Sequence, residues 1–205
     1  MRILPASQAG VPDEELSRVF VEGFYPLLRM LCKDKARLAK ALAHALRREC
    51  FFVVFDEENN RAAAILARTD GKTSSLRTDR RELRRHLGPL RGELAWRVMH
   101  PEVDFPKYPF PMEGMCALEN LAVDSVYRGQ GLARLLMTHA IETAPEEVCV
   151  LEVADSNEVA RPFYERLGFR EAARLPQKWS RFTGVKENLY LRLEVKALVK
   201  SAAKA

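Results

Sequence analysis

The segment from residue 115 to residue 153 constrains the fold more than any other part of this chain. Residues 115–123 and 148–153 are two strongly apolar runs with the lengths of buried strands. Between them, residues 131–143 have an apolar side at helical spacing, made of Leu132, Leu135, Leu136 and Ala140. A strand, a helix and a second strand in this order predict a parallel strand pair with a right-handed crossover. We therefore expect a layered α/β fold.

The residues before this unit predict a strand, two helices and a hairpin. Residues 1–7 read as a strand, and Pro12 with the acids after it starts a helix whose apolar positions continue to Leu31. Pro26 is expected to kink or divide that helix. Residues 33–48 are expected to form a second helix. Residues 51–55 and 61–68 read as two strands around a turn at 57–60.

Residues 70–112 look like an insertion between the third and fourth strands. They are expected to form helices over 79–87 and 93–98 and a loop over 101–111, which holds four prolines. The net charge of +5 concentrates nearby, because residues 61–100 hold ten Lys and Arg against four Asp and Glu. We interpret these arginines (Arg80, Arg81, Arg84 and Arg85) as a solvated helix face, with an acidic group on a substrate as the alternative.

The rest of the chain completes a single expected domain over residues 1–195. A short helix ends at Gly168, and residues 169–175 and 188–195 read as closing strands. Pro162 suggests that this helix starts there. Residues 196–205, rich in Lys and Ala, are expected to be a mobile C-terminal tail.

Composition narrows the class of protein. With 47% hydrophobic and 30% charged residues, the chain of 205 residues lies in the ordinary range of soluble globular proteins. No apolar run has the length of a membrane span or of a signal peptide, so we expect a cytoplasmic protein without membrane attachment. The four cysteines and four histidines show no metal-ligand spacing, and we expect no metal.

A glycine-rich turn between the first apolar run and the helix predicts an anion site. The sequence Arg128-Gly129-Gln130-Gly131-Leu132-Ala133 places glycines and an arginine where backbone amides and the helix dipole favour phosphate. No Gly-Lys-Ser/Thr follows, and Arg134 replaces the third glycine of a dinucleotide fingerprint.

Four successive segments resemble the motifs of the GNAT superfamily of acetyl-CoA-dependent N-acetyltransferases. They are Leu118-Glu119-Asn120-Leu121-Ala122-Val123, the run Tyr127 to Ala133, Leu151-Glu152-Val153 with Asn157, and Phe163-Tyr164-Glu165-Arg166-Leu167-Gly168-Phe169. The resemblance covers about residues 115–172.

The resemblance implies a mixed, twisted sheet of about seven strands flanked by helices, in which the fourth and fifth strands splay apart to admit acetyl-CoA. The backbone of Leu121, Ala122 and Val123 would pair with the pantetheine arm. The amides of Arg128, Gly129, Gln130, Gly131, Leu132 and Ala133 would bind the pyrophosphate. Asn157 matches a position that steadies the arm.

Acyl transfer to an amine needs a base and a proton donor for the leaving thiolate. By resemblance, Tyr164 is the donor; the competing interpretation is a tyrosine that only packs in the core. Glu119 and Glu152 are the candidate bases. Alternation places Glu119 on one face with Leu121 and with Ala117, where relatives carry a base. Glu152 precedes Tyr164 by twelve residues, a spacing that resembles ribosomal-protein N-terminal acetyltransferases.

We expect acetyl transfer to a primary amine of a small molecule, because the insertion offers an aromatic wall for an acceptor pocket (Trp96, Phe105, Tyr108 and Phe110). Protein N-terminal or lysine acetylation is the alternative enzyme activity, and a non-catalytic acyl-CoA sensor is an alternative class. A nucleic-acid partner is disfavoured because no recognition motif accompanies the arginines. A homodimer is compatible with the sequence.

Overall fold

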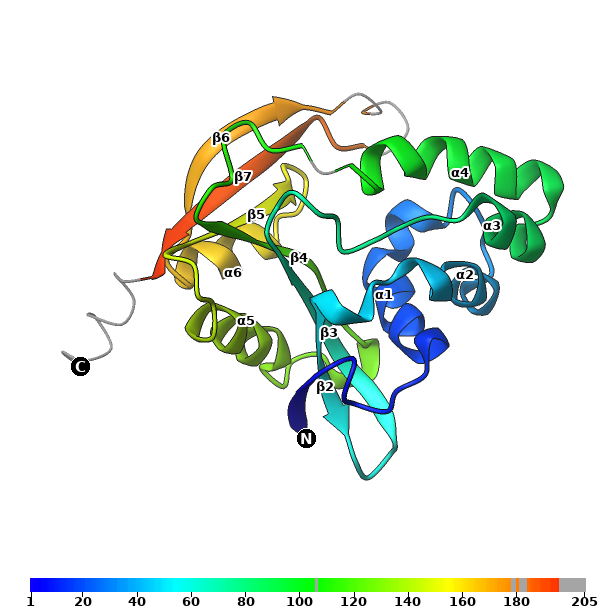
Figure 1. The fold of residues 1–205 in the computed structure, drawn as a ribbon, viewed down its shortest axis with the longest axis horizontal. Coiled ribbons are helices and arrows are strands. Elements are labelled where there is room, and N and C mark those ends of the chain that lie inside the picture. The colour runs from blue at the N-terminus through cyan, green and yellow to red at the C-terminus, as the bar shows by residue number, and fades with distance from the viewer. Residues whose placement is uncertain (106, 178–179, 181–183, 196–205) are drawn as a thin grey trace.

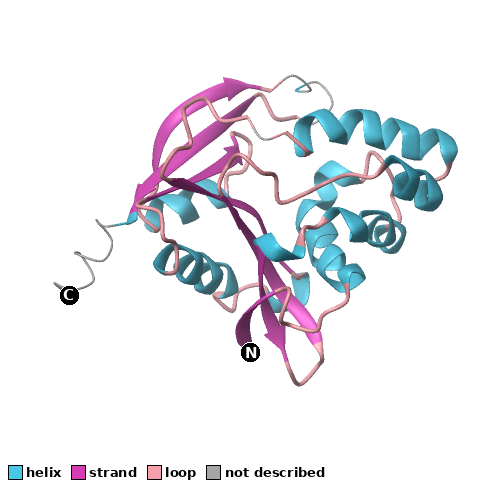
Figure 2. Ribbon diagram, viewed as in Figure 1, coloured by secondary structure: helices cyan, strands magenta, loops and turns pink. Residues whose placement is uncertain are grey.

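The computed structural model describes residues 1–105, 107–177, 180 and 184–195. Within these residues, seven strands form one sheet, and helices pack against it (Figures 1 and 2). The order of the strands across the sheet is β1-β2-β3-β4-β5-β7-β6. The strands are β1 (Arg2–Pro5), β2 (Phe51–Asp56), β3 (Arg61–Thr69), β4 (Met115–Val123), β5 (Val148–Ala154), β6 (Arg170–Pro176) and β7 (Glu187–Glu194). The expected mixed sheet with flanking helices is confirmed.

The expected parallel pair consists of β4 and β5, and every other neighbouring pair is antiparallel. The two parallel strands pair only from Met115 opposite Val148 to Leu118 opposite Leu151. Beyond that point β4 remains paired with β3 as far as Val123, and β5 remains paired with β7 as far as Ala154. The edges of β4 and β5 therefore separate, and their backbone groups face an opening in the middle of the sheet.

Helices cover both faces of the sheet. On one face lie α1 (Asp13–Leu28), α2 (Lys35–Leu42), α3 (Arg80–Leu87) and α4 (Pro89–Val103), which pack with β1 to β4. On the other lie α5 (Leu132–Glu142) and α6 (Ala160–Arg166), which pack with β2 to β5 and β7 (Figure 1). We call these the α1 face and the α5 face of the sheet.

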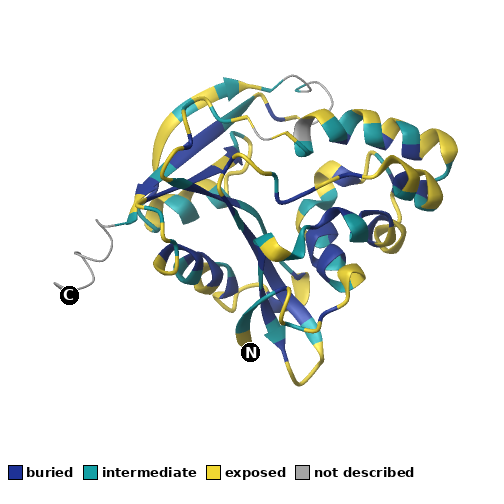
Figure 3. Cartoon of the chain, in the orientation of Figure 1, coloured by how far each residue is buried: buried dark blue, intermediate teal, exposed yellow. Residues whose placement is uncertain are grey.

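Each face has its own apolar core (Figure 3). A third, smaller core lies on the α1 face over β4 and β5, where Met112 packs against Ala117, Val148 and Val150, with Tyr108, Phe110 and Met115 beside them. The covering segment lies within residues 104–112 of the insertion, of which the structure describes 104, 105 and 107–112. This segment brings the insertion onto the two strands that border the opening.

The end of β2 is tied to the glycine turn by a buried hydrogen bond. The hydroxyl of Tyr127 donates to Oδ2 of Asp56 at 2.7 Å. The side chain of Asn59, followed by that of Tyr127, donates hydrogen bonds that lower the pKa of Asp56 to about 2. The turn after β4 is thus anchored to the neighbouring hairpin.

The first helical region differs from expectation in two ways. Pro26, expected to kink or divide the first helix, does not divide α1, which continues through it to Leu28. The second helix is much shorter than 33–48, because it ends at Leu42 and two short 3-10 helices follow (Ala43–Ala45 and Arg48–Cys50). Leu46 forms a β-bridge with Leu76 in the insertion, and that extended pairing is incompatible with a continuing helix.

The insertion and the last helix also differ from expectation. Helix α4 extends from Pro89 to Val103 with Pro101 inside it, so the proline-rich loop begins three residues later than expected. Helix α6 begins at Ala160, not at Pro162. Pro162 is tolerated because the amides of a helix's first turn have no intrahelical acceptor. The expected tail, residues 196–205, lies outside the described residues.

Candidate active site

The glycine turn has the conformation that an anion site requires. Gly129 and Gly131 have φ angles of +78° and +77°, which L-residues rarely adopt, and Gly131 is the N-cap of α5. Within the described part of the chain, no hydrogen-bond acceptor contacts the backbone amides of residues 129–134. Six consecutive amides at the positive end of a helix dipole can therefore bind phosphate oxygens.

Arg128 precedes these amides, and its guanidinium is exposed. Its Nε donates to the carbonyl of Val123 at 3.4 Å, and Nη2 lies 4.0 Å from Oε1 of Glu22 in α1. The cation therefore stands between the end of β4 and the turn. Both neighbouring contacts are long, so the side chain can turn toward a bound anion.

A β-bulge in β4 changes which side chains share a face. Glu119 lies opposite Ala67 and Ala122 opposite Ile65, so β4 holds one residue more than β3, and Asn120 has a φ of +55°. Glu119 therefore projects to the α1 face with Ala117, whereas Leu121 packs into the core of the α5 face. Simple alternation wrongly placed Leu121 beside Glu119.

The carboxylate of Glu119 is held by the insertion. Its Oε2 accepts bonds from Oγ of Ser75 at 2.5 Å and from the Ser75 amide at 3.4 Å. Its Oε1 accepts from the hydroxyl of Tyr108 at 3.0 Å and from Oγ1 of Thr69 at 3.4 Å. Asn120 donates to the same Ser75 hydroxyl at 2.8 Å. Both oxygens of Glu119 are therefore engaged.

Glu152 lies on β5 across the opening, also on the α1 face. It shares that face with Val150, which packs under residues 104–112, and its side chain is exposed. Its antiparallel partner on β7 is Tyr190, whose ring lies edge-on to Tyr108 at 5.9 Å. Glu119 and Glu152, predicted as alternatives, thus project to the same side of the sheet.

Ala117, at the position where the family resemblance implies a base in other members, is fully buried. Met112 and its neighbours in residues 104–112 cover it on the α1 face. An acidic side chain here would be shielded from an acceptor by this covering segment.

Tyr164 lies on the opposite face, in α6. Its ring packs at 5.2 Å from that of Phe163 and at 6.1 Å from that of Phe169, in the core of the α5 face. Burial raises its pKa to about 12, so the phenol keeps its proton throughout the neutral range. Among the described residues no side chain or backbone group hydrogen-bonds its hydroxyl. The hydroxyl is therefore available to a ligand.

Asn157 lies just before α6, at the end of β5. Its Oδ1 accepts a hydrogen bond from the amide of Ala160 at 3.0 Å, so the side chain helps to start the helix. The amide nitrogen of the side chain is exposed to solvent with the rest of the residue. Asn157 thus has a local structural role, while its Nδ2 is left for other contacts.

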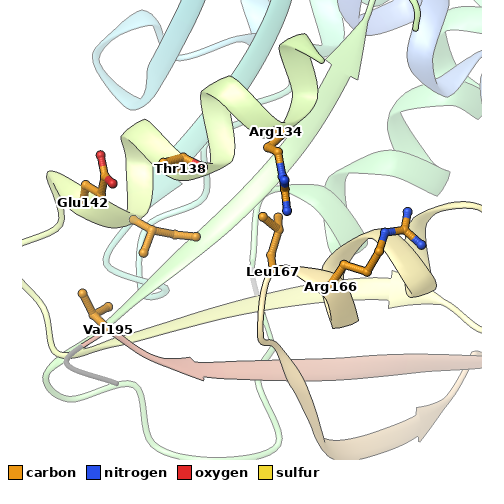
Figure 4. A pocket seen from close by; sticks show the side chains of 7 residues that line it. Arg134, Thr138, Glu142, Arg166, Leu167 and Val195 are labelled. Carbon is orange, nitrogen blue, oxygen red and sulfur yellow. The ribbon is translucent and has the colours of Figure 1, made fainter. Parts of the chain in front are cut away.

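A cavity of about 250 Å³ lies on the α5 face between α5, the end of α6 and the end of β7 (Figure 4). Its lining residues are Arg134, Thr138, Ile141, Glu142, Arg166, Leu167 and Val195. Figure 4 shows Arg134, in the first turn of α5, reaching toward Leu167 near Arg166. Sequence reasoning missed this cavity, because it depends on the packing of α5 against α6.

The aromatic residues of the insertion divide into two groups. Tyr108 and Phe110 pack against Tyr190 over the sheet, with ring centroids 5.9 and 6.3 Å from it. Trp96 instead stacks on His100 along α4, with Arg80 over its ring at 5.3 Å. Of the residues expected to form an acceptor wall, only Tyr108 and Phe110 therefore lie over the strands that carry Glu119 and Glu152, and the acceptor wall itself stays a prediction.

The arginines of α3 lie far from the opening, at the edge of the molecule (Figure 1). Arg80 forms a bidentate ion pair with Glu93 of α4, and Arg85 lies 3.7 Å from Glu82. Arg81 and Arg84 are exposed. This arrangement is the solvated helix face of the first interpretation.

Comparison with known proteins now identifies the family. Residues 91–169 match the sequence model of the acetyltransferase (GNAT) family. The match begins inside α4 and includes β4, the glycine turn, α5, β5 and α6. The chain contains a GNAT acetyltransferase domain. The family expectation drawn from the four motifs is confirmed.

Two curated relatives are similar to part of this chain. Glucosamine 6-phosphate N-acetyltransferase of Trypanosoma brucei brucei is 37% identical over 65 residues, which are 32% of this chain and 44% of that protein. The [ribosomal protein bS18]-alanine N-acetyltransferase of Escherichia coli K12 is 45% identical over 58 residues, 27% of this chain and 39% of that protein. The chain thus matches less than half of the length of either relative.

Solved structures share the fold over nearly the whole chain. An N-acetyltransferase from Staphylococcus aureus Mu50 has a TM-score of 0.56 at 18% identity, covering 94% of this chain and 100% of that one. The protein PH1933 from Pyrococcus horikoshii OT3 has a TM-score of 0.56 at 14% identity, covering 94% and 97%. The fold shared with these two structures therefore extends beyond the matched residues 91–169 to most of the chain.

Two further findings concern membranes and metals. In the part of the chain that the structure describes, no helix is long and apolar enough to cross a bilayer. Over the same residues, no group of three or more His, Cys, Asp and Glu side chains is arranged to hold a metal ion. The cytoplasmic location and the homodimer stay predictions.

Proposed function

We propose that this protein transfers the acetyl group of acetyl-CoA to a primary amine of a small molecule. The observation that carries the proposal is the opening between β4 and β5, with proton-accepting groups on one face and a proton donor on the other. Glu119 and Glu152 project to the α1 face, and Tyr164 lies on the α5 face beside the glycine turn's helix. A molecule bound through the opening would meet both sets of groups.

The glycine turn and the cavity support acetyl-CoA as the donor. The amides of residues 129–134 and the guanidinium of Arg128 suit a pyrophosphate. The unpaired edge of β4, from Glu119 to Val123, offers backbone groups to an extended amide-containing arm. Arg134 and Arg166 add two cations on the same face. The acyl carbon would then lie in the opening, with its sulfur toward Tyr164.

The two faces suit the two proton transfers of aminolysis. The amine nitrogen loses a proton to a base on the α1 face and forms a bond to the thioester carbon. The carbon–sulfur bond breaks, and the departing thiolate takes the proton of the Tyr164 phenol. The products are the N-acetylated amine and the free thiol of coenzyme A. The base then releases its proton to solvent, and Tyr164 regains a proton from solvent.

Of the two carboxylates, we assign the base to Glu152. Both oxygens of Glu119 already accept hydrogen bonds from Ser75, Thr69 and Tyr108, which occupy the lone pairs that a base needs. The side chain of Glu152 is exposed on the same face. In this arrangement Glu119 is a positioning residue that holds Tyr108 and Ser75 beside the site.

Acetylation of a peptide N-terminus is the second candidate. It is favoured by the 45% identity to the bS18-alanine N-acetyltransferase and by the spacing of Glu152 and Tyr164. The small-molecule acceptor is favoured because residues 104–112 cover part of the α1 face near both carboxylates. This cover restricts the space available to a polypeptide.

The test is an amine screen with acetyl-CoA, in which release of the free thiol is followed and products are identified by mass. Wild-type protein should acetylate at least one small amine. Tyr164→Phe should lower kcat by about tenfold to a thousandfold while acetyl-CoA still raises the melting temperature. Acetylation of peptides alone would establish the second candidate. Acetyl-CoA binding without turnover of any amine would instead indicate a sensor.

A further inference from the structure

Arg18 joins α1 to the residue that follows β4. Its Nη1 donates to Oδ2 of Asp124 at 2.5 Å, while Nε and Nη2 donate to the two oxygens of Glu15 at 2.8 Å, in the preceding turn of α1. Nη2 also donates to the carbonyl of Ala62 in β3 at 3.1 Å. The planar guanidinium therefore fixes the relative positions of α1, β3 and the end of β4.

Asp124 begins the segment that leads into the glycine turn. It is the N-cap of the short 3-10 helix Ser125–Tyr127, and its Oδ1 accepts from the amide of Val126 at 3.3 Å. The amide of Asp124 donates to the carbonyl of Ala63 in β3 at 2.9 Å. Arg128 and the glycines follow this 3-10 helix directly. The orientation of Asp124 thus determines how the chain enters the glycine turn.

The charge of Asp124 is balanced by two arginines. Its side chain is only 4% exposed, and Nη2 of Arg61 lies 3.6 Å from the Oδ2 that accepts from Arg18. Burial alone would raise the pKa of Asp124, but the hydrogen bonds from Arg18 and from the Val126 amide outweigh it and hold the pKa below its ordinary value. The carboxylate therefore stays ionised. Without its cations, it would repel an anion at the neighbouring turn.

We propose that Arg18 is a positioning residue for the glycine turn, and that it acts through Asp124 to orient the backbone amides that bind the pyrophosphate of acetyl-CoA. This inference rests on the proposed function and extends its donor site to a residue of α1. Amides bind an anion well when their orientation is set before the anion arrives. The bond from Tyr127 to Asp56 holds the same 3-10 helix from β2, so the turn is fixed from two elements.

The first test is calorimetric titration with coenzyme A of wild type, Arg18→Met and Arg48→Met. Arg48 is a matched control because its side chain is 28% exposed against 29% for Arg18, and it too bonds backbone carbonyls and a carboxylate. Those partners of Arg48 lie within residues 6–13. Both variants lose a buried ion pair, so a fall in melting temperature alone does not distinguish them.

We expect the Kd of coenzyme A to rise at least about tenfold in Arg18→Met and less than about twofold in Arg48→Met. An unchanged Kd in folded Arg18→Met, or equal losses in both variants, overturns the inference and leaves a protein that binds coenzyme A. Failure of wild type to bind coenzyme A overturns the proposed function as well.

The second test asks whether Arg18 acts through Asp124. Asp124→Asn keeps a side-chain oxygen for the Val126 amide and removes the charge that Arg18 pairs with. In the double variant no unbalanced carboxylate remains, so coenzyme A should bind no more weakly than to Arg18→Met alone. Losses that add in the double variant contradict the assignment, because Arg18 would then act by another route.

Arg18→Lys covers the case in which Arg18→Met fails to fold. A lysine keeps the cation but loses the fork that contacts Asp124 and Glu15 together. Arg18→Lys and Asp124→Asn should each raise the Kd of coenzyme A at least about threefold. An unchanged Kd in both variants overturns the inference.

Discussion

Replacing Gly23 by alanine tests how tightly α1 lies on β4. In a helix interior this change is ordinarily stabilising by about 1 kcal/mol, because glycine has the larger conformational entropy when unfolded. Here a Cβ at position 23 would lie 2.6 Å from the Cβ of Ala122 and 3.3 Å from its Cα. Ordinary contact begins near 3.4 Å, so the helix and the strand must separate by about 0.8 Å.

Overpacking of this kind typically lowers the free energy of unfolding by about 1 to 3 kcal/mol. This loss cancels or exceeds the gain of about 1 kcal/mol from helix propensity. We expect Gly23→Ala to lower the free energy of unfolding by up to about 2 kcal/mol in urea denaturation at constant m. Ala122→Gly removes the opposing methyl group and serves as the matched partner. In the double variant the two changes should couple favourably by at least about 1 kcal/mol.

A Gly23→Ala protein that is about 1 kcal/mol more stable than wild type, with no coupling to Ala122→Gly, would refute this reasoning. It would mean that α1 stands farther from β4 than the structure places it. The result matters for function because Ala122 belongs to the strand edge that borders the opening.

Three further predictions concern charged residues. Glu152→Gln should lower kcat by more than about a hundredfold and remove the acidic limb of the pH–rate profile. Glu119→Gln should keep that limb. Loss of the limb in Glu119→Gln alone would reverse the assignment of the base. Asp56 has a folded pKa of about 2 against an ordinary 3.8, so its contribution to stability is present above pH 3.8 and is lost as the pH falls toward 2. Melting temperatures across this range should therefore fall less steeply in Asp56→Asn than in wild type, and equal slopes would contradict the shift. Arg81→Ala and Arg84→Ala should change the acceptor KM by less than about twofold, since both side chains are solvated; a tenfold rise would place them at the acceptor.

The glycine turn and the β4-α5-β5 unit were predictable because their signals are local. Glycines next to an amphipathic segment predict left-handed turns at a helix start, and both Gly129 and Gly131 have that conformation. The bulge in β4 was missed, although its signal is present. Asn120 in an apolar strand is a residue type that tolerates positive φ, and one extra residue reverses the faces that follow it.

The acceptor side was not predictable from local patterns. Tyr108 and Glu119 were each identified, as a pocket wall and as a base, but their hydrogen bond depends on where residues 104–112 lie. That placement depends on contacts such as the one between Lys107 and Tyr190, which are 83 positions apart in the chain. Helix α2 ends early for the same reason, since the bridge between Leu46 and Leu76 joins two distant segments.

The glycine turn is proposed to bind acetyl-CoA, and calorimetric titration tests this binding most directly. Gly131→Asp places a carboxylate at the positive end of α5, and Gly10→Asp is the matched control, because Gly10 also has a positive φ, +64°, with open space around it. Wild type and Gly10→Asp should bind acetyl-CoA with a Kd on the order of micromolar, and Gly131→Asp should weaken binding at least about a hundredfold. Equal affinity in folded Gly131→Asp, or no binding by wild type, would contradict the account.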